Sequence, residues 1–444
     1  MHNRLRQARQ LLHYHPAFLI LKKISARELS MLGLRSKEVP ARRQHASKEQ
    51  KLKMEKCLIV SKVTRYEYEK HSHDNISNWE LEKILRNRGS DYDSMVSNHK
   101  EQKSFEEGVA KALKEMGVKV EMASRLTYNE EMINWCDAVV PCGGDGTFLL
   151  AASRVRDANK PVIGFNSAPH KSVGRLCLPT WCSNDLKGAL QALKEGKFRW
   201  MRRSRIRTTI TSDQKLLDSI TPVDLHTLHF CRYPPVSNQE DSHEAATRLK
   251  DPQEESKCSL ATKVLPFLAL NEVFIGESVT SRVSLLRLKI DDGKWAHTKS
   301  SGLCVTTGTG STSWHYSINC LRTHSVLELM KILHEEYGVD LDTSLEKARE
   351  VTEKYNTKLM FPPDSEQLAY SVREYITFEE WPAPRGLRVR DRAEAVTVRS
   401  HCTDAGLVID GSVSFPFNDG TQALLEIHPE DSLMTVQMDD ALPF

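Results

Sequence analysis

The stretch VVPCGGDGT at residues 139–147 constrains the fold of this chain more than any other feature. An apolar run ends there, three glycines surround one acid, and a helical pattern follows. Glycines let the backbone turn tightly and approach a ligand, while free N–H groups at a helix start attract phosphate. The stretch therefore predicts a strand–turn–helix unit whose phosphate-binding residues are Gly143, Gly144, Gly146 and Thr147.

Asp145, the acid inside this turn, is the candidate catalytic residue. A carboxylate repels phosphate, so this side chain is better placed to accept a proton from a hydroxyl that attacks phosphorus. The alternative is a glycine-rich turn in which the acid only complements the helix dipole. Three glycines are more than a turn needs, which favours the catalytic interpretation. The pattern is neither GxxxxGK[ST] nor GxGxxG.

The surrounding sequence alternates strand and helix, which indicates parallel βαβ units and an α/β domain over residues 56–195. Capping-box spacing at Ser77 and again at Ser104 predicts two helix starts. The expected strands are 57–63, 118–122, 137–141 and 162–165, and the expected helices are 77–87, 104–116, 130–135 and 148–155.

Residues 200–430 are predicted to form a second, β-rich domain. Two segments interrupt it: 232–263, a polar stretch interpreted as a loop, and 325–357, which has helical periodicity. Residues 431–444 are expected to be a C-terminal tail. The expected strands are 205–211, 268–275, 283–290, 303–307, 395–399, 407–409 and 424–427.

A second cluster of small and hydroxyl residues, TTGTGSTSW, lies at residues 306–314 after an apolar strand. Its N–H and O–H donors suit a polyphosphate or a ribose, and Trp314 suits the flank of an aromatic base. By composition alone it is also compatible with a flexible turn. The candidate phosphate-binding residues are Thr307, Gly308, Thr309, Gly310, Ser311 and Thr312.

Asn271 and Glu272 form a polar pair inside an apolar strand. Buried polar atoms without partners cost about 1–3 kcal/mol each, so the pair either satisfies itself within the protein or holds ligand hydroxyls. Asp410-Gly411 follows another apolar run and by itself is a hairpin turn.

Together these motifs resemble the NAD kinase family. GGDGT is also similar to the loop of diacylglycerol and sphingosine kinases, but those lipid kinases lack the second motif, which resembles the family's STPTGSTAY signature. Asn271-Glu272, Asp410-Gly411 and the strand ending at Asn166 occur in the family's order, and the spelling is most like the animal mitochondrial members. Three positions depart from it: Gly308 replaces a common Pro, Ser313-Trp314 replaces Ala-Tyr, and Ser301 replaces a dinucleotide-binding Asp.

The resemblance implies a Rossmann-like α/β domain, then a sandwich-like β domain, and ATP-dependent phosphorylation of the 2′-hydroxyl of the adenosine ribose of NAD. It implies ATP as donor and a homo-oligomer, with a dimer favoured. Phosphoryl transfer requires charge neutralisation, so Mg²⁺ or another divalent cation is expected to be brought with ATP; the sequence shows no dedicated carboxylate cluster, and no resident metal is expected. The NAD-binding candidates are Asn166, Asn271, Glu272, Ser313, Trp314 and Asp410. The rival functions are a lipid kinase of the same superfamily and a non-catalytic NAD sensor.

The charge of the chain is unevenly distributed. Residues 1–50 hold 11 Lys/Arg and 3 Asp/Glu, so the other 394 hold 51 basic and 56 acidic residues although the whole chain has net charge +3. An Arg-rich, acid-poor start with apolar residues at helical spacing is typical of an organelle transit peptide, and a solvated basic tail is the alternative. With the family resemblance, this head predicts the mitochondrial matrix as the location.

The same distribution argues against a nucleic-acid partner, because the remaining body is slightly acidic. No run of 18 apolar residues predicts a membrane span, and the ten cysteines show no C-x-x-C pair for zinc. Anionic substrates must therefore be attracted by local groups, for which the basic candidates are Lys171, Arg175, Arg282 and Lys299.

Overall fold

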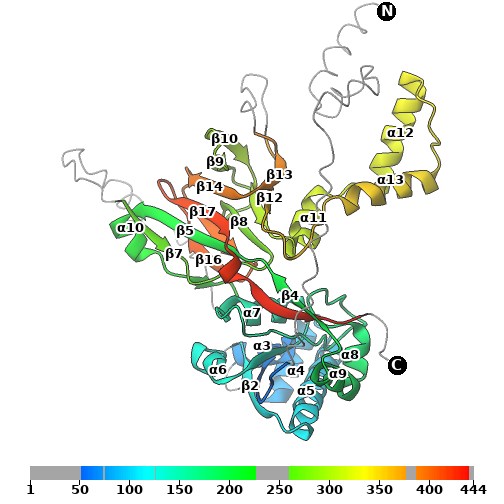
Figure 1. Cartoon of the computed structure of the whole chain (residues 1–444), viewed down its shortest axis with the longest axis vertical. Coiled ribbons are helices and arrows are strands. Elements are labelled where there is room, and N and C mark those ends of the chain that lie inside the picture. The colour runs from blue at the N-terminus through cyan, green and yellow to red at the C-terminus, as the bar shows by residue number, and fades with distance from the viewer. Residues whose placement is uncertain (1–51, 74–75, 126, 227–259, 377–386, 440–444) are drawn as a thin grey trace, which may run out of the picture. The chain divides into compact units, whose positions relative to one another are not determined.

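The computed structural model describes residues 52–73, 76–125, 127–226, 260–376 and 387–439 (Figure 1). The basic head and residues 232–259 of the predicted loop lie outside these ranges, so the predictions about them stay predictions. No helix among the described residues has the length and apolarity to cross a membrane.

The first part of the described chain contains a parallel sheet of three strands in the order β2-β1-β3. Single parallel bridges join Val139 to Val162 and Cys142 to Phe165, where the sequence predicts a fourth strand. The strands are β1 (Lys56–Ser61), β2 (Lys119–Ser124) and β3 (Ala138–Cys142). The helices are α3 (Arg65–Ser72), α4 (Asn78–Asn87), α5 (Tyr92–Glu115), α6 (Glu130–Trp135), α7 (Asp145–Arg154), α8 (Thr180–Asn184) and α9 (Leu186–Lys194).

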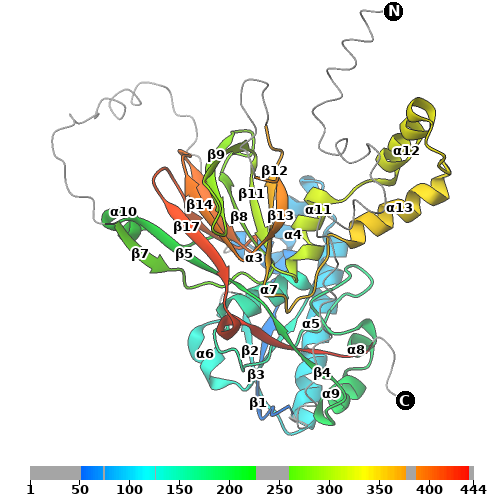
Figure 2. The same cartoon turned by 45° about the horizontal axis from the view of Figure 1, so that its top comes forward.

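Alternate residues of β1 pack on opposite faces of this sheet, as a strand with helices on both sides requires. Cys57 and Ile59 join a buried cluster with residues of α5 and α9, while Leu58 and Val60 join another with residues of α6 and α7. Figure 2 shows α5 and α9 beside these strands. The α/β class predicted for this region is confirmed.

The helix predicted to begin at Ser104 instead begins at Tyr92, so that prediction was wrong. Asp91 caps α5 by accepting a hydrogen bond from the N–H of Ser94 at 3.0 Å. Gln102 and Glu106 are polar but lie on the buried face of α5, where the Gln102 amide donates to the Glu106 carboxylate at 2.6 Å. Polar residues at buried positions interrupt the apolar pattern, so the sequence does not reveal this part of the helix. The capping box predicted at Ser77 is present at the start of α4.

The second part contains two antiparallel sheets, in the orders β10-β9-β14-β17-β5-β7 and β13-β12-β11-β8-β15-β16-β6. One buried cluster draws residues from both, among them Ile210 and Leu288 from the first and Ile275 and Leu407 from the second. This is the β-rich, sandwich-like class that the sequence predicts. The strands are β5 (Ile206–Asp213), β6 (Val223–Asp224), β7 (Leu260–Val264), β8 (Glu272–Glu277), β9 (Ser284–Ile290), β10 (Ala296–Ser300), β11 (Gly302–Thr306), β12 (Leu368–Arg373), β13 (Arg390–Ala393), β14 (Ala395–Ser400), β15 (Ala405–Ile409), β16 (Val413–Pro416) and β17 (Gln422–Ile427).

Two segments expected to be irregular contain strands. The end of the predicted 232–263 loop is β7, which pairs with β5, and the predicted tail contains β18 (Leu433–Gln437), which pairs with β4 (Arg199–Arg203). The tail forms a strand because Val436 and Met438 bury their side chains in the cluster beneath the parallel sheet. The α/β core therefore includes residues from the far end of the chain.

The helical insertion predicted at 325–357 is present as α12 (Thr323–Tyr337) and α13 (Leu345–Thr357), which pack against each other. Both views show them as a hairpin beyond α11 (Trp314–Asn319) (Figures 1 and 2). The remaining short elements are α10 (Gln214–Ser219), η3 (Gly310–Thr312) and η4 (Pro429–Asp431).

Candidate active site

Asp145 is the first residue of α7, directly after the carboxyl end of β3. Its carboxylate accepts hydrogen bonds from the backbone N–H groups of Leu176 at 2.8 Å and Arg175 at 3.2 Å. The N-cap Gly144 gives the helix no side-chain hydrogen bond. The backbone at residues 175 and 176 thus holds the acid in a fixed orientation beside an uncapped helix start, which is an anion-binding feature.

Two of the three glycines of the turn differ in what surrounds them. A Cβ on Gly143 would lie 2.8 Å from Cβ of Thr147 and 3.2 Å from Cβ of Lys62, so packing excludes a side chain there. A Cβ on Gly146 would meet no atom within 4 Å. The space beside Gly146 is therefore open to a ligand, and its predicted contact with phosphate stays a prediction.

The hydroxyls of the 307–312 loop are largely used by the protein itself. The Thr307 hydroxyl donates to the carbonyl of Leu270 at 2.5 Å, and the Ser311 hydroxyl donates to that of Gly308 at 2.6 Å. The Thr312 hydroxyl donates to the carbonyl of Thr309 at 3.3 Å. These side chains shape the loop, so their predicted contacts with phosphate stay predictions.

The departure at Gly308 has a packing reason. A Cβ on Gly308 would overlap the carbonyl oxygen of Pro362, and a Cβ on Gly310 would overlap that of Asn271. The N–H of Phe361 also donates to the hydroxyl of Ser311 at 3.1 Å. The 361–363 segment, which follows α13, therefore packs directly against the 307–312 loop. This contact leaves no room for the proline that most NAD kinases have at position 308.

Asp410 holds the segment that carries Asn271 and Glu272. It has φ +47° in the turn between β15 and β16, as the Asp-Gly pattern predicts. Its carboxylate accepts from the backbone N–H groups of Leu270 and Asn271 at 2.8 Å and of Glu272 at 3.1 Å. Burial nevertheless raises its pKa to about 6. Asp410 is thus a positioning residue in this structure, while its predicted contact with NAD stays untested.

Asn271 and Glu272 present oxygen atoms that have no partner among the described residues. The Asn271 amide donates to the hydroxyl of Ser313 at 3.3 Å, but its Oδ1 and the Oε2 of Glu272 are buried without a hydrogen bond. Unpaired buried acceptors are rare and costly in native proteins. Because burial keeps a proton on Glu272 near neutral pH, the pair can accept hydrogen bonds from ligand hydroxyls and also donate one to them.

Replacement of Glu272 with Gln is expected to change the pH dependence of stability. Burial, with the charge of Asp410, raises the pKa of Glu272 from 4.5 to about 8. Between these values the folded state keeps a proton that the unfolded state releases, so stability falls as pH rises, by about 1.4 kcal/mol per pH unit. Urea unfolding at pH 6 and 7 should show a smaller loss in Glu272→Gln than in the parent; equal losses would contradict the assignment.

Arg203, which sequence reasoning missed, lies between the two main motifs. It is half-buried, it donates to the hydroxyl of Thr309 at 3.3 Å, and its charge interacts with that of Asp145. Burial lowers its pKa to about 10, and its Nε has no hydrogen-bond partner among the described residues. One basic residue in an Arg-rich strand carries no special signal, so only the fold brings it to the site.

Two other predicted NAD-binding residues, Trp314 and Asn166, make contacts within the protein. Trp314 stacks on Phe274 with ring centroids 4.4 Å apart, and the guanidinium of Arg373 lies 6.0 Å from its ring. Asn166 uses its amide within its own loop, donating to the carbonyl of Ser172 at 2.9 Å and accepting from the N–H of Ala168 at 3.1 Å. Asn166 therefore shapes the loop that follows the parallel sheet.

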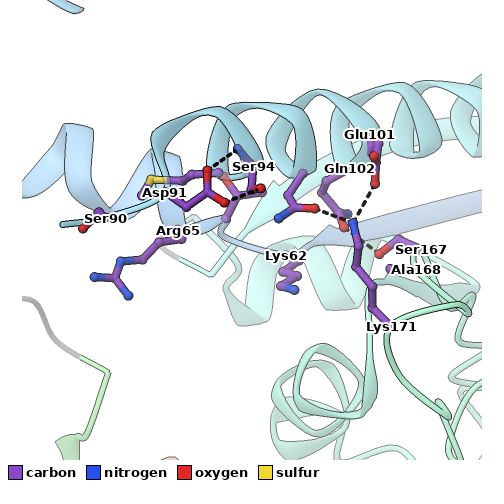
Figure 3. A pocket seen from close by; sticks show the side chains of 13 residues that line it. Lys62, Arg65, Ser90, Asp91, Ser94, Glu101, Gln102, Ser167, Ala168 and Lys171 are labelled. Carbon is purple, nitrogen blue, oxygen red and sulfur yellow. Dashed lines mark hydrogen bonds and ion pairs between the residues drawn. The ribbon is translucent and has the colours of Figure 1, made fainter. Parts of the chain in front are cut away.

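A cavity of about 450 Å³ lies at the carboxyl edge of the parallel sheet, where Lys62 follows β1 and Ser167 follows the bridge residue Phe165 (Figure 3). Lys62 and Lys171 line it, and Lys171 forms an ion pair with Glu101 at 3.0 Å. Ligands of open α/β sheets bind at this edge. Of the other basic candidates, Arg175 offers its backbone to Asp145, Arg282 donates to Thr403, and Lys299 lies on β10.

The described residues contain no group of three His, Cys, Asp or Glu side chains that could hold a metal ion. An uncapped helix start with an acid, a glycine-rich second loop and buried unpaired acceptors together define a nucleotide-dependent phosphotransferase site.

Known proteins agree with this class. Residues 42–197 match the family model described as the ATP-NAD kinase N-terminal domain. The chain is 37% identical over 388 residues to the human protein named "NAD kinase 2, mitochondrial", covering 86% of this chain and 84% of that protein. It is 36% identical over 405 residues to the protein of the same name from Xenopus tropicalis, covering 87% and 91%. The chain belongs to the NAD kinase family.

Among solved structures, an NAD kinase from Archaeoglobus fulgidus in complex with ATP aligns with a TM-score of 0.42 and 16% identity. That alignment covers 87% of this chain and 94% of the archaeal one.

Proposed function

We propose that this chain transfers the γ-phosphoryl group of ATP to the 2′-hydroxyl of the adenosine ribose of NAD, giving NADP and ADP. Family membership supports the overall reaction. The observation that carries the assignment of the site is the buried pair of unpaired acceptors on Asn271 and Glu272, next to the 307–313 loop. Ribose hydroxyls both donate and accept hydrogen bonds, which suits an amide oxygen beside a protonated carboxyl.

In this proposal Asp145 accepts the proton of the 2′-hydroxyl as that oxygen forms its bond to the γ-phosphorus. The bond between the γ-phosphorus and the bridging oxygen breaks, and ADP leaves with the electron pair. The two backbone N–H groups that bond to Asp145 hold the carboxylate toward the attacking hydroxyl. Arg203 places a positive charge between Asp145 and Thr309, where phosphate charge has to be stabilised.

We assign the donor nucleotide to the cavity lined by Lys62 and Lys171. The side chain of Lys62, on its wall, also lies beside Gly143, so we place the triphosphate between this cavity and the start of α7. Magnesium is proposed to enter with ATP, where it neutralises the charge of the phosphates.

We further propose that the protein acts in the mitochondrial matrix as a homodimer. The relatives named as mitochondrial support the compartment, and the basic, acid-poor head supports a transit peptide. The dimer rests on the family resemblance alone.

The targeting proposal has its own test. Residues 1–50 fused to a fluorescent reporter should direct the reporter to mitochondria, because a segment with 11 basic and only 3 acidic residues suits import. A matched fusion with Arg4, Arg6 and Arg9 replaced by Gln should lose this location. A diffuse signal from the unaltered fusion would contradict the proposal.

The test of the reaction is NADP formation by the purified full chain with ATP, magnesium and NAD, measured by enzymatic cycling. The proposed function predicts NADP and ADP in equal amounts. The lipid-kinase alternative predicts phosphorylated diacylglycerol and no NADP, and the sensor alternative predicts NAD binding without turnover. Either of these results would overturn the proposal.

A further inference from the structure

A second cavity lies at the edge strand β13, on residues that the proposed reaction does not use. Its volume is about 330 Å³, and its walls come from β13, from Ala369 on β12 and from the end of α13. Arg392 pairs with Ala369 across the two strands, and both residues line the cavity. The helical insertion thus completes a cavity against the β domain.

The lining of this cavity is strongly cationic. Arg388, Arg390, Arg392 and Lys358 contribute four positive charges, and of the described lining residues only Asp391 is acidic. Arg390 and Arg392 are two residues apart on β13, so their side chains leave the strand on the same face. Like charges gathered around one cavity repel one another, and an anion removes that repulsion.

The contacts within the cavity balance only part of this charge. Asp391 accepts from Arg388 at 2.9 Å, and Arg390 donates to the neutral hydroxyl of Tyr355 at 3.0 Å. The guanidinium of Arg392 lies over the ring of Phe361, 3.2 Å from its centroid. An aromatic ring and a phenol do not neutralise a cation, so the lining keeps a net charge of three with its histidine neutral.

His315, a buried residue that lines the cavity, is affected by the positive charge of the same arginines. Its Nδ1 lies 3.0 Å from the hydroxyl of Ser371. Burial, followed by the charges of Arg390 and Arg392, lowers its pKa to about 4. The imidazole ring is therefore uncharged near neutral pH, and it lines the cavity as a neutral hydrogen-bonding group.

We propose that this cavity binds a small phosphorylated anion of two to three negative charges, separate from the ATP and NAD of the reaction. Guanidinium groups bind phosphate oxygens through paired N–H donors, and a pyrophosphate of charge about −3 at neutral pH matches the charge of the lining. Its occupant would connect Lys358 at the end of α13 to the arginines before and within β13. The proposal does not depend on the proposed function, because no site residue of that reaction lines the cavity.

The experiment is hydrogen exchange of the full chain at low salt, titrated with inorganic pyrophosphate. The proposal predicts protection in residues 352–361 and 387–393. Lys358 and Arg388 are exposed, so Lys358→Gln/Arg388→Gln should fold normally, keep NADP formation, and raise the apparent Kd for that protection at least about tenfold. The control Arg399→Gln, an exposed arginine on β14, should bind as the parent does.

The result that would overturn the proposal is protection confined to the regions around 143–147 and 307–314, or unchanged protection at 352–361 and 387–393 in the double variant. Far-UV circular dichroism of the double variant checks that it is folded. Loss of NADP formation in the parent would leave this test unaffected, so the two proposals fail independently.

Discussion

Asp145→Asn is expected to lower kcat for NADP formation by about 10²- to 10⁴-fold, the range that removal of a general base produces. An amide cannot accept the proton of the attacking hydroxyl. It keeps one oxygen to receive the backbone N–H of Leu176, which bonds to the carboxylate at 2.8 Å. We therefore expect the turn, the melting temperature and the Kd for NAD to change little. Steady-state kinetics with calorimetric NAD binding separates the two effects.

The matched control is Asp292→Asn, an exposed acid in the turn between β9 and β10. It makes the same chemical change far along the chain from the glycine turn and should keep parental kcat. An active Asp145→Asn enzyme would remove Asp145 as the base while leaving the reaction itself in place. Loss of NAD binding in that variant would instead give Asp145 a role in binding.

Gly308→Pro should destabilise the protein even though it introduces the residue that most NAD kinases have there. Any atom at the Cβ position overlaps the carbonyl oxygen of Pro362, so either the 307–312 loop or the 361–363 segment has to move. Overpacking of this kind costs about 1–3 kcal/mol, which corresponds to a drop in Tm of roughly 1–8 °C for a unit of this size. Because the loop lies beside Asn271, NADP formation should fall as well. Thermal unfolding and the NADP assay measure both.

Gly146→Ala is the matched control for stability, since its Cβ has no neighbour within 4 Å. We expect parental Tm for this variant but reduced NADP formation, because the methyl group enters space assigned to phosphate. A Gly308→Pro protein with parental Tm and activity would show that the contact with Pro362 does not explain the glycine.

The sequence predicted the elements whose signals are local. Short sequence patterns, which do not depend on tertiary contacts, predict several of them. These are the glycine turn, the capping box at Ser77, the Asp410 turn and the helices α12 and α13. The same local information identified the parts of the candidate site that lie in motifs, including Asp145 and the Asn271-Glu272 pair.

What the sequence did not predict depends on partners far along the chain. In the sequence Arg203 is one of several basic residues, and only the fold places it beside Thr309. The segment that forms β18 has no strand signal that distinguishes it from a tail, and it forms a strand by pairing with β4. The start of α5 was missed because the buried polar pair Gln102 and Glu106 breaks the apolar period. In each case the residue acquires its role through a tertiary contact that no local pattern encodes.

The most direct test of the account is the position of the transferred phosphate. The purified full chain, given ATP labelled with ³²P in the γ position, magnesium and NAD, should produce a labelled dinucleotide that an NADP-specific dehydrogenase reduces, with one ADP per label. Asp145→Asn should form this product at a rate lower by the factor given above. Hydrolysis of ATP without a labelled dinucleotide, or a labelled product that the dehydrogenase rejects, would contradict 2′-phosphorylation of NAD by this site.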